Sequence, residues 1–240
     1  ALNGERMTMG ILPDRSELLG VIGGHVISSD AKAMAFFLGR AIVEAGYKLA
    51  TGGCRGAGEF ASRGAAKYCD AHALDVCEHV FAIVRWGDSP EFSQCRTVRA
   101  GKDDFERGMV MMGRTRSVFI VGGGGGTERE IMNAAVDDYM AWGTANILPV
   151  SGTGGIAERI LAMGARYNDS VLDSPDVSLP KANLLVQSID RYRFSLFDFW
   201  DLDIQEGWRC GDRHPAVRRT YRIRHYGKKQ GEGPIRVEGE

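Results

Sequence analysis

The stretch VGGGGGTERE, from Val121 to Glu130, places five consecutive glycines between an apolar run and a charged run. Glycine in such number weakens a regular helix or strand, because it loses more conformational freedom on folding than any other residue. The preceding residues 117–121 (SVFIV) are typical of a buried β-strand, and the following residues 127–142 (TEREIMNAAVDDYMAW) are typical of a helix. The sequence therefore predicts a strand, a bare glycine turn and a helix in immediate succession.

Apolar strands and helices alternate in the same way along most of the chain. Strands are predicted at 18–25, 47–53, 79–86, 94–100 and 145–152, and helices at 30–45, 57–69, 103–115 and 154–167. We expect Asp30 to cap the first helix, and Phe105, Met109 and Met112 to form the apolar face of the helix over 103–115. Apolar strands flanked by helices favour a single Rossmann-like α/β domain, with a doubly wound parallel sheet covered by helices on both faces.

The domain organisation follows from where this alternation begins and fades. Residues 1–17 form a polar lead-in, residues 18–168 the nucleotide-binding domain, and residues 169–240 a C-terminal extension that packs on or beside that domain. After residue 208 the extension is basic, which is typical of a solvated tail, with a phosphate-rich partner as the alternative. In the segment RYRFSLFDFWDLD, three aromatic residues recur at helical spacing and indicate a packing stripe.

Composition excludes several classes of protein. The chain has 240 residues, 44% of them hydrophobic, with a formal net charge of -1, so it has no general attraction to nucleic acid or membrane. No apolar run approaches the roughly 18–20 residues that span a bilayer, and no signal peptide is visible. The five cysteines include no C-x-x-C pair and the histidines show no metal-ligand spacing. We therefore expect a cytoplasmic protein with no metal, no cofactor, no membrane and no nucleic acid.

Glycines recur where the predicted strands end. In an open parallel sheet, ligands bind at the carboxyl ends of the strands, and a helix N-terminus there offers unpaired N–H groups to a phosphate. The residues predicted to contact such a ligand are Gly23, Gly24, Gly53, Gly122, Gly123, Gly124, Gly125, Gly126 and Thr127. The P-loop pattern is absent, and the strand at 79–86 ends in Arg85-Trp86 where a dinucleotide fold would place an acid. These features favour a mononucleotide.

Charged residues near the glycine run allow two interpretations. Thr127 and Glu130 have the spacing of a capping box, in which Thr127 caps the helix and Glu130 bonds back to the N-cap amide. Alternatively Glu130 faces the ligand crevice. Arg107 is either a surface ion-pairing residue or part of the same site. His25 could contact a nucleotide or bond to backbone, and Cys54 would need a histidine base in space to act as a nucleophile.

The run GGGGGTERE resembles the P-G-G-x-G-T-x-x-E signature of the lonely guy (LOG) family, once described as lysine decarboxylases. Counting back without a gap places the family's helical arginine on Arg107 and a recurrent methionine on Met111. VIGGH and ATGGCRGAGEFASRGA also look like the first two strand-end loops of the larger bacterial nucleotide nucleosidases of this group. The resemblance covers roughly residues 18–167.

The resemblance implies an N-glycosidase that hydrolyses a nucleoside 5′-monophosphate to free base and ribose 5-phosphate, without metal or cofactor, and that forms a homodimer. Arg107 and Glu130 would be the catalytic pair, and Gly123, Gly124, Gly126 and Thr127 would bind the phosphate. A carboxylate near C1′ suits this chemistry, because cleavage builds positive charge on the sugar ring.

The sequence departs from the family pattern at three positions. Gly122 stands where the family has proline, Gly108 where it has lysine, and Arg129 where it often has an acid. These departures keep open a non-catalytic carrier of a nucleotide or of the molybdenum cofactor on the same fold, or a DNA-processing relative that uses the basic tail.

Overall fold

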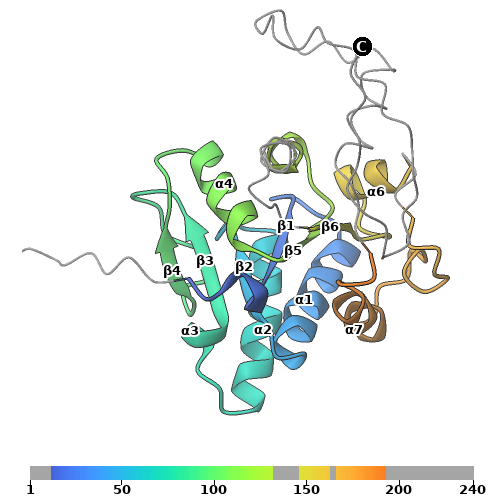
Figure 1. The fold of residues 1–240 in the computed structure, drawn as a ribbon, viewed down its shortest axis with the longest axis horizontal. Coiled ribbons are helices and arrows are strands. Elements are labelled where there is room, and N and C mark those ends of the chain that lie inside the picture. Colours follow the sequence, from blue (N-terminus) through green and yellow to red (C-terminus); the bar gives the residue numbers. More distant parts are fainter. Residues whose placement is uncertain (1–11, 132–145, 163–165, 193–240) are drawn as a thin grey trace, which may run out of the picture. The chain divides into compact units, whose positions relative to one another are not determined.

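A computed structural model describes residues 12–131, 146–162 and 166–192 (Figure 1). Three predictions fall outside these residues: the later part of the helix over 127–142, the aromatic stripe after residue 192 and the basic tail after residue 208.

A six-stranded sheet forms the centre of the described domain, in the order β4-β3-β2-β1-β5-β6, and every neighbouring pair is parallel. The strands are β1 (Leu18–Gly23), β2 (Lys48–Thr51), β3 (Val80–Val84), β4 (Arg96–Arg99), β5 (Ser117–Val121) and β6 (Asn146–Pro149). The central strand β1 pairs Leu19 with Leu49 on one side and Ser117 on the other. The strand order reverses between β1 and β5, and this switch point is where open α/β sheets bind ligands.

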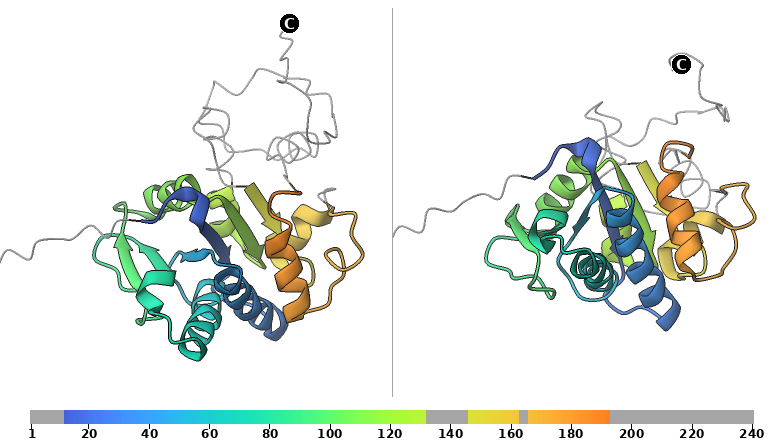
Figure 2. Two further views of the ribbon diagram at one scale, coloured as in Figure 1. Left: turned by 60° about the horizontal axis from the view of Figure 1, so that its bottom comes forward. Right: turned by 90° about the horizontal axis from the view of Figure 1, so that it is seen from below.

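Helices cover both faces of the sheet. Helices α1 (Ser29–Glu44), α2 (Ala57–Ala71) and α7 (Leu179–Gln187) lie together on one face, and α4 (Asp104–Arg114) lies on the other (Figure 2). The short α3 (Val76–His79) precedes β3, α6 (Gly155–Ala162) follows β6, and a further helix begins at residue 125 directly after β5. The predicted Rossmann-like, doubly wound α/β fold is confirmed.

The core follows the two-residue period of the strands. Leu19 and Val21 of β1 join the cluster formed with α1, α2 and α7. Gly20, one residue between them, faces the other way, where an added Cβ would lie 3.0 Å from Met111 Cε of α4. Side chains from 172 to 189, including Leu172 and Leu185, belong to the same cluster. The described part of the C-terminal extension therefore contributes to the core of the domain itself.

One local prediction is wrong, and a second is right only for Met112. Ser28, not Asp30, caps α1: its Oγ accepts a hydrogen bond from the Ala31 N–H at 3.1 Å, and this earlier start leaves Asp30 in the first turn, where its charge suits the helix dipole. The inner face of α4 consists of Gly108, Met111 and Met112, an i, i+3, i+4 set. Phe105 lies off this face and is 57% exposed.

Candidate functional site

The glycine-rich turns after β1, β2 and β5 meet at the carboxyl edge of the sheet. A Cβ built on Gly24, after β1, would lie 3.4 Å from the Gly123 nitrogen, after β5. A Cβ built on Gly56, after β2, would lie 2.2 Å from the Gly24 carbonyl oxygen, and the Ala57 N–H donates to that oxygen at 3.1 Å. The three turns therefore pack backbone against backbone at the switch point.

The first two glycines of the run are required by the fold. Gly122 and Gly123 have φ values of +62° and +104°, which other residues rarely adopt. The Gly122 N–H donates to Thr153 Oγ1 at 2.9 Å, and the amides of Ile156 and Ala157 donate to the carbonyls of Gly123 and Gly122, both at 3.1 Å. These bonds fix the turn after β5 against the start of α6.

The last three glycines are not required by the fold. Gly124, Gly125 and Gly126 are exposed, have no positive φ, and a Cβ added to any of them would meet nothing within 4 Å. The first amides of the helix that begins at 125 have no acceptor within that helix, and no hydrogen bond from them occurs among the described residues. A bare backbone beside free amides is what close approach of an anion requires.

The capping-box interpretation of Thr127 and Glu130 is wrong. The Glu128 N–H donates to the Gly124 carbonyl at 2.9 Å, so the helix starts before Thr127, and Thr127 lies buried within its first turn at 4% exposure. The Glu130 carboxylate is then one turn into the helix, where it points to Arg107 instead of back to the N-cap amide.

Arg107 and Glu130 form an ion pair at this edge. Arg107 Nη2 donates to Glu130 Oε1 at 2.9 Å, and the side chains are 12% and 15% exposed. The second guanidinium nitrogen, Nη1, lies 3.3 Å from the Gly52 carbonyl oxygen and 3.2 Å from Cys54 Sγ. Asp104, one turn earlier on α4, lies 3.5 Å from Nη2. Arg107 is therefore held from three sides and is largely buried, so its interpretation as a surface ion-pairing residue is wrong.

Burial raises the pKa of the Glu130 carboxyl above its ordinary value, and the Arg107 guanidinium offsets part of that rise. A carboxylate destabilised by burial has a stronger tendency to take up a proton. Such a group suits proton transfer near neutral pH better than an ordinary surface glutamate does.

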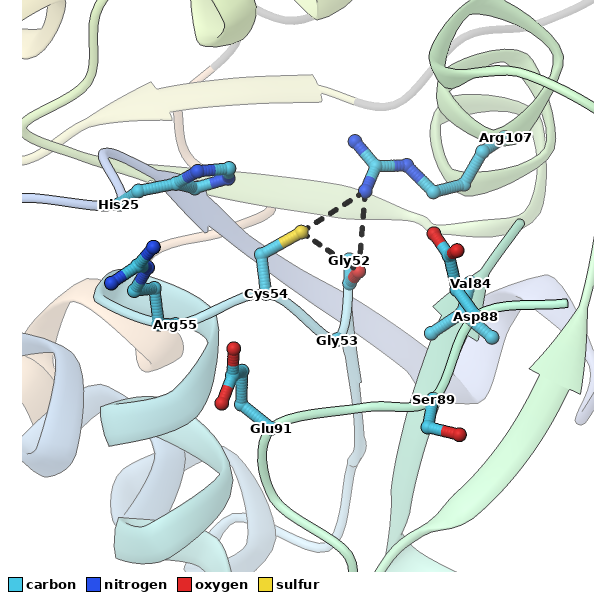
Figure 3. A pocket seen from close by; sticks show the side chains of 10 residues that line it. All are labelled: His25, Gly52, Gly53, Cys54, Arg55, Val84, Asp88, Ser89, Glu91 and Arg107. Atoms are coloured by element: carbon cyan, nitrogen blue, oxygen red, sulfur yellow. Dashed lines mark hydrogen bonds between the residues drawn. The ribbon is translucent and has the colours of Figure 1, made fainter.

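A pocket of about 240 Å³ lies beside this pair, at the ends of β1, β2 and β3 (Figure 3). Arg107, Cys54 and His25 line it, together with Gly52 and Gly53. Its outer wall is the loop between β3 and β4, with residues 88, 89 and 91. Arg107 connects the pocket with the ion pair, because its Nη1 faces the pocket and its Nη2 contacts Glu130.

The predicted site residues thus divide into two groups. Gly53 and Arg107 line the pocket. Glu130 and the turn at 122–127 do not line the pocket: Glu130 contacts Arg107 Nη2, and the turn packs against the turn at Gly23 and Gly24. Sequence reasoning missed the contacts of Arg107 with the Gly52 carbonyl and with Asp104, and it missed the loop over 88–91, which carries no motif.

Within the described residues no group of three histidine, cysteine or acidic side chains could hold a metal ion. The same residues include no helix with the length and apolar character to cross a bilayer.

The fold and the meeting of glycine-rich turns define a Rossmann-like α/β protein. No protein-family profile and no curated protein matches the sequence. Among solved structures, a molybdenum cofactor binding protein from Rippkaea orientalis is similar at a TM-score of 0.50 and 19% identity, over 72% of this chain and 96% of that one. The molybdenum cofactor carrier protein from Chlamydomonas reinhardtii has a TM-score of 0.49 at 18% identity, over 73% and 99% of the two chains. The structural genomics target TM1055 has a TM-score of 0.48 at 24% identity, over 60% and 79%. At these identities the likeness concerns the fold.

Proposed function

We propose that the protein is a hydrolase that cleaves the N-glycosidic bond of a nucleoside 5′-monophosphate, releasing the free base and ribose 5-phosphate. The observation that carries this proposal is the buried ion pair of Arg107 and Glu130, which joins the turn at 122–127 to the pocket. A site that only binds an anion has no need of a carboxylate there, because a negative charge next to a phosphate weakens its binding.

The phosphate is assigned to the turn at 124–127. Three consecutive positions there leave the backbone bare, and the first amides of the following helix are free to donate. The positive end of the helix dipole adds roughly half an elementary charge at that point. The sugar then lies between the phosphate and the ion pair.

In the reaction, the C1′–N bond breaks and the base leaves with the bonding electrons, while a water molecule adds to C1′. Glu130 stabilises the positive charge that develops on the sugar and takes the proton that the water loses. Arg107 fixes the orientation of Glu130 through the bond from Nη2, and Nη1 is placed to hold a sugar hydroxyl or the leaving base. The proton then passes to the base, so that both products are neutral at the reacting centre.

The proposal is tested by incubating the protein with AMP, GMP, CMP, UMP and modified monophosphates and assaying free base. We expect base release that falls at least about 10³-fold in Glu130→Ala, since such a carboxylate acts in the transition state. A circular dichroism spectrum and an unfolding curve serve as the control for folding. Equal rates in wild type and Glu130→Ala would refute the assignment.

The alternative on this fold is a protein that binds without turnover, for a nucleotide or for the molybdenum cofactor named in the Rippkaea orientalis structure. The same incubation separates the two proposals. If a monophosphate binds and none is cleaved, the carrier function replaces the hydrolase. We also propose a homodimer, which light scattering of the purified chain would test.

A further inference from the structure

The pocket beside Arg107 is of a size that suits one ring system. Its volume of about 240 Å³ is below the roughly 300–1,000 Å³ of pockets that enclose whole drug-sized ligands. Arg107 Nη1 contacts Gly52 and Cys54 in the wall of the pocket, while Nη2 of the same guanidinium donates to Glu130. Under the proposed function, on which this inference rests, the group that enters the pocket is joined to the sugar at Glu130. That group is the base.

Of the two carboxylates that line the pocket, one is paired with a cation and one is not. Asp88 is engaged, because its Oδ2 accepts from Arg85 Nε at 2.7 Å. Glu91 has no ion-pair or hydrogen-bond partner for its side chain among the described residues. Its backbone is nevertheless fixed, since the Glu91 N–H donates to the Gly53 carbonyl at 2.9 Å. Figure 3 shows its carboxylate turned into the space below Cys54 and Arg55.

One guanidinium in the pocket has unused donors. Arg55 lines the cavity, and within the described parts of the chain its side chain has no partner. Its place is set by the next two residues: Gly56 has a φ of +81° and packs on Gly24, and the Ala57 N–H donates to the Gly24 carbonyl at 3.1 Å. The pocket therefore presents one free anionic acceptor from the loop after β3 and one free cationic donor from the turn after β2.

This pair of groups matches one base. Guanine carries two adjacent donors on its Watson–Crick edge, N1–H and the 2-amino group, which a carboxylate accepts together, and two adjacent acceptors, O6 and N7, which are the usual target of arginine. Adenine offers a donor beside an acceptor on each edge, the pattern read by asparagine or glutamine, and neither residue is among those that line the pocket. Cytosine has one donor next to two acceptors, and uracil has a single donor between two acceptors, so neither offers two adjacent donors to a carboxylate.

We propose that this pocket is a base subsite selective for guanine, in which Glu91 accepts from N1–H and the 2-amino group and Arg55 donates to O6 and N7. Glu91 is solvent-exposed, so water competes for its oxygens. The selectivity is therefore modest, about tenfold for each charged contact, well below the roughly 10⁴-fold that a fully buried polar site gives.

The test compares kcat/KM for GMP, IMP, XMP and AMP in wild type, Glu91→Gln and Arg55→Met. IMP lacks the 2-amino group and XMP replaces it with a carbonyl oxygen that faces Glu91. We expect GMP to exceed IMP and AMP by about tenfold or more, with XMP the poorest. Glu91→Gln should lower kcat/KM for GMP by about tenfold, lower it less for IMP, which keeps only N1–H, and relieve the exclusion of XMP. Arg55→Met should lower kcat/KM for GMP and IMP together. Arg40 and Glu44, an exposed pair on α1, supply the matched controls Arg40→Met and Glu44→Gln.

The outcome separates this inference from the proposed function. If the monophosphates are cleaved at similar rates, or if Glu91→Gln leaves the GMP to AMP ratio unchanged, the guanine subsite is refuted while the hydrolase stands. If none is cleaved, the proposed hydrolase function is refuted. Dissociation constants for the same panel then test whether the pocket selects guanine. Tighter binding of GMP than of AMP, lost in Glu91→Gln, would then support it, and equal binding would overturn it.

Discussion

Replacing Arg107 with methionine should destabilise the protein in a way that depends on pH through Glu130. The two side chains are only 12% and 15% exposed and are joined at 2.9 Å, so Arg107→Met leaves a nearly buried carboxylate without its cation. Breaking a buried pair by removing one partner costs about 3–5 kcal/mol. We take the lower end, about 3 kcal/mol near pH 8, because both groups retain some contact with solvent.

The sign of the pH dependence follows from the raised pKa of Glu130. A carboxyl group whose folded-state pKa lies above its unfolded value binds more protons in the native state, so it lowers stability as pH rises from the unfolded value to the folded one. Arg107→Met removes the group that opposes this rise and therefore widens that pH window upward. The cost of the substitution should be smallest at the acid end of the range, where Glu130 takes up a proton most readily, and should increase towards pH 8.

A double-mutant cycle with Glu130→Gln isolates the pair from the other contacts of Arg107. The two substitutions are not equivalent, because in Glu130→Gln the Arg107 guanidinium keeps Asp104 at 3.5 Å, the Gly52 carbonyl and the amide oxygen of the new glutamine. Glu130→Gln alone should therefore change the unfolding free energy by less than about 1 kcal/mol, and the double variant should be more stable than Arg107→Met by about 2 kcal/mol at pH 8. Urea unfolding at four values from pH 5 to 8, followed by circular dichroism, measures these differences. A cost of Arg107→Met that is the same at every pH, or additive single effects, would show that this coupling is absent.

Three other outcomes are expected from the structure. Gly123→Ala should lower the unfolding free energy by about 2 kcal/mol or more, because φ is +104° and the new Cβ would lie 2.6 Å from a side-chain atom of Ile156. Gly125→Ala should not lower the unfolding free energy but should weaken nucleotide binding. Urea unfolding measures the stability of each variant, and nucleotide titration measures its binding. Thr153→Val should cost about 1–2 kcal/mol in urea unfolding, since it removes the acceptor of the Gly122 N–H. Burial raises the pKa of Cys95 to about 11, so Cys95→Ser should leave the number of thiols that react rapidly with a disulfide reagent at pH 8 unchanged.

The centre of the sheet could be predicted from the sequence because β1 and β5 are short apolar runs that end in or run into glycine. β5 and β3 are buried at every position, which is the pattern of parallel strands covered on both faces. Helix α7 was not predicted, although Ser178 caps it and a proline stands in its first turn. Its nine residues mix polar and apolar side chains with weak periodicity, so only packing against the core stabilises it as a helix.

Less of the candidate site could be predicted. Arg107 and Glu130 are 23 positions apart in the sequence, and only the family resemblance put them together; no local rule relates a residue in the middle of α4 to one in the next helix. The contact of Arg107 with Cys54 spans 53 positions. Glu91 and Arg55 lie in loops without periodicity, and their shared cavity depends on the register of β2 beside β3. Such contacts depend on the order and register of the strands. The patterns in a single sequence predict the class of fold but not that order or register.

The five glycines therefore have two different physical explanations. Gly122 and Gly123 allow the backbone to turn sharply after β5, and this turn makes the hydrogen bonds to Thr153 and to the first amides of α6 possible. Gly125 and Gly126 satisfy nothing in the domain itself: they begin a helix, where glycine is less stable than alanine by roughly 0.5–1 kcal/mol per residue. These two glycines therefore lower the stability of the first helical turn, where no hydrogen bond from the backbone amides occurs among the described residues. A bound anion that approaches those amides more closely than a Cβ would permit recovers that loss, and this is the physical reason to assign the phosphate to this turn.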